Sequence, residues 1–242
     1  MMATMAPAHG PPAPSPSAGW ARSRAALETY FDRTAFRQWE ALTSDAPVSR
    51  VRATVRAGRE AMRATLLGWL PQDMRGQSLL DAGCGTGALA VEAARRGARV
   101  TAVDVSAQLI ALARARAPAD LAIDWRVGDM LAEGPAAFDH VVAMDSLIHY
   151  APDDMAAALA ALGARAQRSL MVTFAPRSGF LSLMHGVGRL FPRADRAPAI
   201  RPVARDRLVA ALGAALPGFR AGREQRIARG FYTSHALELV PR

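Results

Sequence analysis

Lysine is absent from the 242 residues, and cysteine occurs once, at Cys84. A single cysteine excludes an internal disulfide framework and any zinc finger built on cysteine ligands, which fits a reducing compartment. No apolar run approaches the ~18 residues of a membrane span, and the start of the chain lacks the basic and apolar regions of a secretion signal. These absences predict a cytoplasmic protein that contacts a membrane at most peripherally.

All of the positive charge is therefore carried by arginine, and 30 basic against 21 acidic side chains give a formal net charge of +9. Arginine suits carboxylates, phosphates and flat π-systems because its guanidinium group is planar and permanently charged. A GC-rich coding sequence would also explain the abundance of arginine and alanine, and we weight this explanation above nucleic-acid binding. The sequence contains no RNA-binding module and no dense basic-aromatic cluster, so we expect no nucleic-acid partner.

The pattern of apolar residues divides the chain into three predicted parts. Residues 1–19 form a leader rich in proline and alanine, residues 20–71 a helical arm, and residues 72–242 an α/β domain with an insertion at about 177–204. Short apolar strands alternate with helices in this domain, which is typical of a doubly wound parallel sheet. The predicted strands are 78–83, 98–104, 122–129, 138–146, 169–176, 219–227 and 231–239, and the predicted helices among them are 86–96, 107–117, 153–167 and 205–216.

A glycine-rich loop, Asp81-Ala-Gly-Cys-Gly-Thr-Gly87, follows the first predicted strand. Its glycines let the backbone adopt positive φ and approach a ligand closely, and the helix that follows directs free N–H groups at that ligand. Alone, the loop also satisfies the dinucleotide-binding fingerprint. We read Cys84 as a small residue between two glycines, since no histidine stands at a spacing that would activate it as a nucleophile.

Acidic residues at the ends of the first three strands separate the two interpretations. Asp81 can reach a ligand ammonium, Asp104 can bind ribose hydroxyls, and Asp129 with Met130 can hold an adenine. Together with the loop, over 78–176, they resemble the S-adenosylmethionine-dependent class I methyltransferases. This resemblance implies a seven-stranded Rossmann-like sheet whose last strand is antiparallel, with S-adenosylmethionine as co-substrate. The implied cofactor-binding residues are Asp81, Gly83, Cys84, Gly85, Gly87, Asp104, Val105, Ser106, Asp129, Met130 and Met144. A dehydrogenase remains the less favoured alternative, because the remainder of the chain looks too short for a second nucleotide-binding half.

The acceptor is indicated by segments outside the cofactor motifs. The run Met144–Tyr150 lacks the Asn/Asp-Pro-Pro-aromatic tetrapeptide of enzymes that methylate nucleic-acid bases. The segments Tyr30–Trp39, Asp145–Tyr150, Phe191–Arg196 and Phe231–Leu239 resemble the magnesium-protoporphyrin IX O-methyltransferases. This resemblance extends from Trp20 to the C-terminus. It implies methylation of one propionate carboxylate of Mg-protoporphyrin IX in chlorophyll or bacteriochlorophyll biosynthesis.

The same resemblance implies roles for individual residues. Tyr30 belongs to an arm that covers the cofactor and His149 faces the transferred methyl group, so both are catalytic candidates. Without the resemblance we would favour an ordinary structural role for each, Tyr30 in a helix interface and His149 as a partly exposed residue that opens the next helix. The substrate-binding candidates are Asp145, Ile148, Arg177, Met184, Phe191, Arg193 and Arg196. The apolar stripe over 180–191 fits a porphyrin wall and an ordinary core helix equally well. The five histidines form no metal-ligand pattern, so we expect the magnesium to be carried by the substrate.

Two other functions stay open at this point. One is O-methylation of another small molecule, such as a quinone precursor, and the other is a non-catalytic porphyrin carrier, since a fold alone does not prove activity. The family resemblance also implies that the large subunit of magnesium chelatase hands over the porphyrin. The surplus positive charge is compatible with docking on an acidic partner or on the photosynthetic membrane.

Overall fold

The computed structural model describes residues 17–34, 36–44, 47, 49–132, 137–177 and 199–242. Most of the predicted leader and most of the predicted insertion lie outside the described residues. Among those that are described, no helix is long and apolar enough to cross a membrane.

A seven-stranded sheet with strand order β3-β2-β1-β4-β5-β7-β6 forms the centre of the protein. Its strands are β1 (Ser78–Ala82), β2 (Arg99–Asp104), β3 (Ile123–Val127), β4 (Phe138–Ala143), β5 (Ala166–Phe174), β6 (Phe219–Arg229) and β7 (Tyr232–Pro241). The first five pair in parallel, and β7 runs antiparallel to both of its neighbours. This confirms the predicted fold class, including the antiparallel last strand. The order reverses between β1 and β4, and ligands of such sheets bind at the carboxyl ends of the strands beside this point.

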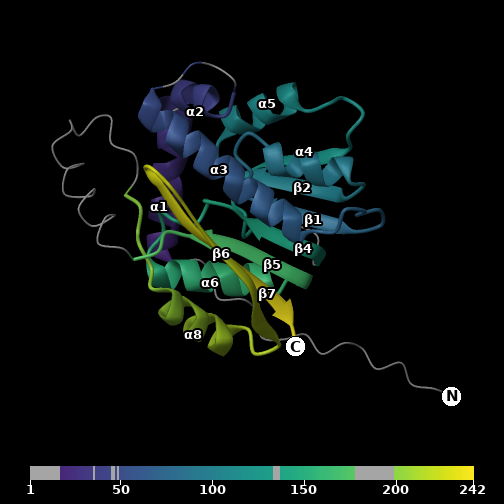
Figure 1. The fold of residues 1–242 in the computed structure, drawn as a ribbon, viewed down its shortest axis with the longest axis vertical. Coiled ribbons are helices and arrows are strands. Elements are labelled where there is room, and N and C mark those ends of the chain that lie inside the picture. Colours follow the sequence, from purple (N-terminus) through teal and green to yellow (C-terminus); the bar gives the residue numbers. More distant parts are fainter. Residues whose placement is uncertain (1–16, 35, 45–46, 48, 133–136, 178–198) are drawn as a thin grey trace.

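Helices cover both faces of the sheet (Figure 1). They are α1 (Ala18–Thr29), α2 (Phe36–Leu42), α3 (Arg50–Trp69), α4 (Ala88–Arg95), α5 (Ala107–Arg116), α6 (Pro152–Gly163) and α8 (Arg205–Ala215), with a π-helical turn η1 (Tyr30–Thr34). Successive strand residues face opposite sides, so in β1 Leu79 belongs to the buried cluster that includes α3 and α4, and Leu80 to the cluster that includes α6 and α8. The central parallel strands β1 and β4 are buried on both faces and are mostly apolar, whereas the edge strand β3 is only partly buried and alternates apolar and charged residues.

The N-terminal helices are tied to the edge of the sheet where the acidic residues lie. Ser17 caps α1 by accepting a hydrogen bond from the Trp20 backbone N–H at 3.0 Å. The buried Trp20 ring stacks on Tyr150, with ring centroids 4.0 Å apart. Figure 1 shows α1 and α2 beside one edge of the sheet, whereas α3 runs diagonally across a face of it. The arm is helical as predicted, with a π-helical turn between α1 and α2 that the sequence pattern did not indicate.

Three predicted boundaries are wrong by three or four residues. The helix predicted to reach residue 167 ends at Gly163, and β5 begins at Ala166. Gly163 lies so close to Leu216 that a Cβ there would be 2.3 Å from the leucine Cδ1, a tertiary contact that the local pattern does not reveal. The strand predicted to reach residue 146 ends at Ala143, because Asp145 adopts a left-handed conformation with φ of 53°.

Candidate cofactor and acceptor site

The glycine loop turns sharply off β1 and binds to the end of β2. The backbone N–H groups of Gly83 and Cys84 both donate to the Val103 carbonyl, at 2.8 and 3.0 Å. Gly83 has φ of 82°, and a Cβ there would lie 2.2 Å from the Ser146 Cβ. Gly87 has φ of 76° and begins α4. Only glycine fits these positions, so the loop leaves a bare backbone path along the carboxyl edge of the sheet.

Asp104 is fixed at the end of β2 by that loop. One carboxylate oxygen accepts the Gly85 N–H at 2.8 Å, and the other accepts the Ser106 N–H at 3.0 Å. Burial raises the pKa of the Asp104 carboxyl above its ordinary value, and these two hydrogen bonds act in the opposite direction. The arm also reaches this point, since the Ser106 hydroxyl donates to the carboxylate of Asp32 in η1. The sequence analysis assigned no role to Asp32. The only indication in the sequence was that Asp32 lies two residues after the catalytic candidate Tyr30.

Asp129 follows β3 and is held mainly by the arm. Its carboxylate accepts the Trp20 indole N–H at 2.9 Å and the Leu131 backbone N–H at 2.9 Å, and Arg24 lies 3.7 Å away. The neighbouring Met130 is buried. The structure therefore brings the third predicted acidic position to the same edge as Asp104.

A cavity of about 310 Å³ joins this edge to the catalytic candidates. Gly83, Asp104 and Met130 line one part of it, and Tyr30 and His149 line another. The other lining residues are mostly apolar or aromatic: Leu27, Phe31, Trp39, Val55, Arg59, Gly85, Val105, Leu109, Met144, Asp145, Ser146, Ile148, Tyr150, Ala175, Ile200, Phe231, Tyr232, Thr233 and Ser234. Most of the predicted cofactor residues and both catalytic candidates thus border one space.

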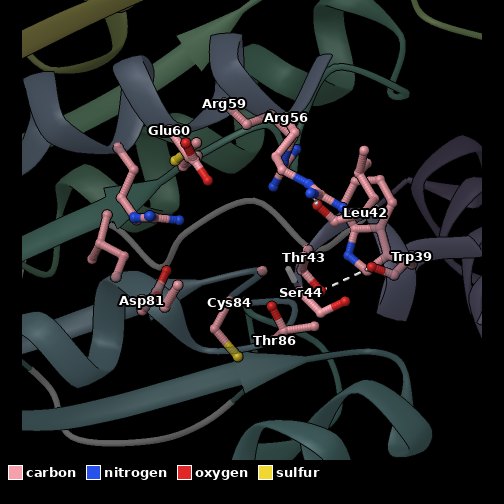
Figure 2. Close-up of a pocket in the computed structure, with 15 residues that line it drawn as sticks. Trp39, Leu42, Thr43, Ser44, Arg56, Arg59, Glu60, Asp81, Cys84 and Thr86 are labelled. Atoms are coloured by element: carbon pink, nitrogen blue, oxygen red, sulfur yellow. Dashed lines mark hydrogen bonds between the residues drawn. The ribbon is translucent and has the colours of Figure 1, made fainter. Parts of the chain in front are cut away.

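A second cavity of about 290 Å³ lies between the glycine loop and α3. Figure 2 shows Asp81, Cys84 and Thr86 on one side of it, with Arg59 and other polar residues of α3 opposite. The two cavities share Trp39, Arg59, Gly83 and Met144. Burial raises the pKa of the Cys84 thiol well above its ordinary value, so the residue stays a thiol, as expected for a packing role.

Two buried oxygen atoms at this edge have no hydrogen-bond partner among the described residues: Asp81 Oδ2 beside the second cavity and Ser146 Oγ beside the first. Asp81 is only 2% exposed, and burial together with the nearby charge of Asp104 raises its pKa to about 7. A buried polar atom without a partner is costly unless a ligand satisfies it. A cationic group placed beside Asp81 Oδ2 would satisfy this oxygen and favour the ionised carboxylate.

Comparisons with known proteins agree with this geometry. Residues 143–241 match the family model described as the magnesium-protoporphyrin IX methyltransferase C-terminus, and residues 79–167 match a methyltransferase domain model. The chain is 47% identical over 225 residues to the magnesium-protoporphyrin O-methyltransferase of Rhodobacter capsulatus, which covers 92% of this chain and 98% of that protein. The chain belongs to the magnesium-protoporphyrin O-methyltransferase family.

More distant members of the family cover nearly as much of the chain. The chloroplastic magnesium protoporphyrin IX methyltransferase of Arabidopsis thaliana is 30% identical over 222 residues, 89% of this chain and 70% of that protein. The crystal structure of the Synechocystis magnesium protoporphyrin IX methyltransferase with bound S-adenosylhomocysteine superposes with a TM-score of 0.81 at 27% identity. It covers 90% of this chain and 100% of that chain.

Asp145, predicted from the family resemblance to bind substrate, lines the first cavity but is already engaged by protein groups. Its carboxylate lies 2.8 Å from the Arg59 guanidinium and accepts hydrogen bonds from the hydroxyls of Tyr232 at 3.1 Å and Thr173 at 2.9 Å. Its side chain is 4% exposed. The Arg59 guanidinium also lies over the Trp39 ring, 4.6 Å from the centroid. Asp145 therefore joins α3 to β5 and β7, and sequence reasoning missed its partners because they are far away in the chain.

The remaining predicted acceptor residues differ in how the structure places them. Ile148 lines the first cavity, whereas Arg177 is exposed and borders neither cavity. Met184, Phe191, Arg193 and Arg196, with the apolar stripe over 180–191, lie outside the described residues. Within the described ranges, no group of three or more His, Cys, Asp or Glu side chains has the arrangement of a metal site.

Proposed function

We propose that this protein transfers the methyl group of S-adenosylmethionine to a propionate carboxylate of Mg-protoporphyrin IX, giving the monomethyl ester for chlorophyll or bacteriochlorophyll synthesis. The observation that carries the proposal is the first cavity, in which the glycine loop and Asp104 border the same space as Tyr30, His149 and a largely apolar wall. Family membership supports the choice of acceptor, because the Rhodobacter capsulatus relative is named for this reaction.

The residues present fit S-adenosylmethionine. The unpartnered Asp81 oxygen suits the ammonium group, and the Asp104 carboxylate can accept further hydrogen bonds from ribose hydroxyls because each oxygen has more than one lone-pair direction. We assign Asp129 and Met130 to the adenine. When bound, the cofactor supplies a methyl group on a positively charged sulfur, which an oxygen anion takes up while the electron pair of the broken bond returns to sulfur.

The acceptor needs no general base. A propionate has a carboxylate pKa near ~4–5, so it is already an anion at neutral pH. The protein must instead exclude water and align the carboxylate. Burial raises the pKa of the Tyr30 hydroxyl, which therefore remains protonated and able to donate a hydrogen bond. We propose that Tyr30 and His149 position the reacting oxygen.

We propose that the ion pair between Arg59 and Asp145 keeps the carboxylate of the acceptor reactive. Arg59 borders the first cavity, but its charge is paired with Asp145 at 2.8 Å. A free guanidinium at this place would bind the propionate as a bidentate pair and lower its nucleophilicity. The pairing with Asp145 keeps this positive charge from holding the reacting carboxylate too tightly.

Substituting the two candidates tests these roles. We expect His149→Ala and Tyr30→Phe each to lower kcat by about tenfold or more, up to ~10²-fold, because misplacement of a reacting group is costly. The dissociation constant for S-adenosylmethionine, measured by calorimetry, should change much less. His235→Gln is the matched control, since His235 borders neither cavity. Wild-type kinetics in both variants would refute the assignment.

We also propose that the chain is divided into a leader that ends at residue 19, an arm that ends at residue 71, and a catalytic domain whose insertion at about 177–204 binds the acceptor. We propose that Met184, Phe191, Arg193 and Arg196 contact the porphyrin, while the position of Arg177 favours a role outside the cavity. Alanine variants with an increased KM for the porphyrin would support these contacts.

Two interactions complete the proposal. The family resemblance and the net charge of +9 support transfer of the porphyrin from the large subunit of magnesium chelatase and peripheral contact with the photosynthetic membrane. Co-sedimentation with anionic vesicles tests the membrane contact, and faster esterification of chelatase-bound than of free porphyrin tests the transfer.

A further inference from the structure

The turn between β6 and β7 presents an apolar side chain at the first cavity. Phe231 is 45% exposed and borders this cavity, whereas Val51 and Val127, the other large exposed apolar residues of the described part, do not. A half-exposed phenylalanine beside a binding cavity is a candidate ligand contact, because burying aromatic surface is strongly favourable.

The backbone on both sides of Phe231 is held in place. Gly230 has φ of 55°, and a Cβ there would lie 2.6 Å from the Thr54 Oγ1 of α3. The Phe231 N–H donates to the same hydroxyl oxygen at 3.3 Å. On the other side, the buried Tyr232 packs against Gly58 of α3 and hydrogen-bonds to Asp145. The turn is thereby fixed to α3. The backbone at Phe231 is therefore already ordered before a ligand binds, which lowers the entropic cost of a contact with the Phe231 ring.

The surroundings of Phe231 suit a large flat apolar ligand. Val55 of α3, Ile148 after β4, and Ile200 border the same cavity. Tyr30, Ser146 and the glycine loop border the cavity as well and supply polar groups. A macrocycle that carries carboxylates needs both apolar surface and polar groups in its site.

We infer that Phe231, together with Val55 at the border of the same cavity, is a specificity-determining contact for the face of the porphyrin ring, with the propionate edge directed toward Tyr30 and His149. This inference rests on the proposed function and adds to it a substrate wall built by the β6–β7 turn. The turn contributes no group to the methyl transfer itself, so its effect falls on porphyrin binding.

Porphyrin binding in the presence of S-adenosylhomocysteine tests the inference, because the complex cannot turn over. We expect Phe231→Ala to raise the Kd for Mg-protoporphyrin, measured from the shift of its Soret band, by about tenfold. KM should rise by a similar factor with a much smaller change in kcat, and the Kd for S-adenosylmethionine should stay within about twofold. Phe231→Leu should keep most of the affinity. Val51→Ala, an exposed apolar control on α3, should behave as wild type.

Three results separate the inference from its alternatives. An unchanged porphyrin Kd in a folded Phe231→Ala variant, with wild-type protein forming the ester, would overturn the inference and leave the function intact. Failure of the wild-type protein to form the ester would overturn the proposed function. A wild-type dimer that Phe231→Ala converts to a monomer without loss of porphyrin affinity would make the turn an interface between two copies.

Discussion

Replacing Asp81 by asparagine should stabilise the cofactor-free protein at neutral pH while weakening its binding of the cofactor. Asp81 is buried, one of its oxygens has no partner within the described part of the chain, and its pKa is raised from 3.8 to about 7. The folded protein therefore retains a proton that the unfolded chain releases above pH ~4. The contribution of Asp81 to the free energy of unfolding is fully present below pH ~4, the pKa of the unfolded chain, and is lost as the pH rises through about 7, the pKa of the folded protein.

The magnitude follows from the difference between the two pKa values. A rise from 3.8 to about 7, at ~1.36 kcal/mol per unit, corresponds to about 4 kcal/mol of destabilisation above pH 7. This is a large part of the ~5–15 kcal/mol by which most domains are stable. Asparagine carries no charge at any of these pH values, so the variant avoids this cost.

Urea denaturation of both proteins between pH 4 and 8 measures the effect. The variant should gain stability relative to wild type as the pH rises, by up to about 4 kcal/mol at pH 8. The affinity of wild type for S-adenosylhomocysteine should increase with pH through about 7, since the ligand ammonium favours ionised Asp81. This pH dependence should be absent in Asp81→Asn.

The exposed Asp73 provides the control, because its pKa is lowered to about 2 by Arg75 and its substitution should not stabilise the protein at pH 8. The reasoning would be refuted if Asp81→Asn were no more stable than wild type at pH 8 and if the free energies of unfolding of the two proteins changed with pH in the same way.

Two further predictions concern the framework of the site. Gly87→Ala should destabilise the protein by about 1–3 kcal/mol, because φ is 76° and a Cβ would lie 2.3 Å from the Trp125 ring. The control Gly68→Ala lies in open space on α3 and should stabilise the protein by about 0.5–1 kcal/mol. Equal effects of the two substitutions in urea denaturation would contradict this prediction. Asp145→Asn should cost about 3 kcal/mol by leaving the Arg59 charge without its partner, and adding Arg59→Met should recover part of the loss; strictly additive effects in the double-mutant cycle would show that the pair is not coupled.

The gathering of the acidic residues at one edge of the sheet was predictable because it depends on local patterns and on one rule of topology. Asp81, Asp104 and Asp129 each lie at or just after the end of a predicted strand, and parallel strands bring their carboxyl ends to one edge. The structure places all three there.

The acceptor side was much less predictable, because its contacts join distant parts of the chain. Asp145 was expected to face the substrate, yet its partners come from α3, β5 and β7. The contact of Phe231 with Thr54 spans 177 residues and has no signature in either segment. Arg177 looked suited to binding a propionate. It follows Pro176, which forms an isolated bridge with Val203, and Arg177 itself is exposed.

The most direct test of the proposed function is incubation of the purified protein with S-adenosylmethionine and Mg-protoporphyrin IX, followed by mass analysis of the porphyrin. We expect one added methyl group per porphyrin, matched by an equal amount of S-adenosylhomocysteine, with metal-free protoporphyrin esterified more slowly. Esterification of both porphyrins at equal rates would contradict recognition of the metallated ring. Binding of both ligands without formation of any ester would contradict the central claim and identify the protein as a porphyrin carrier.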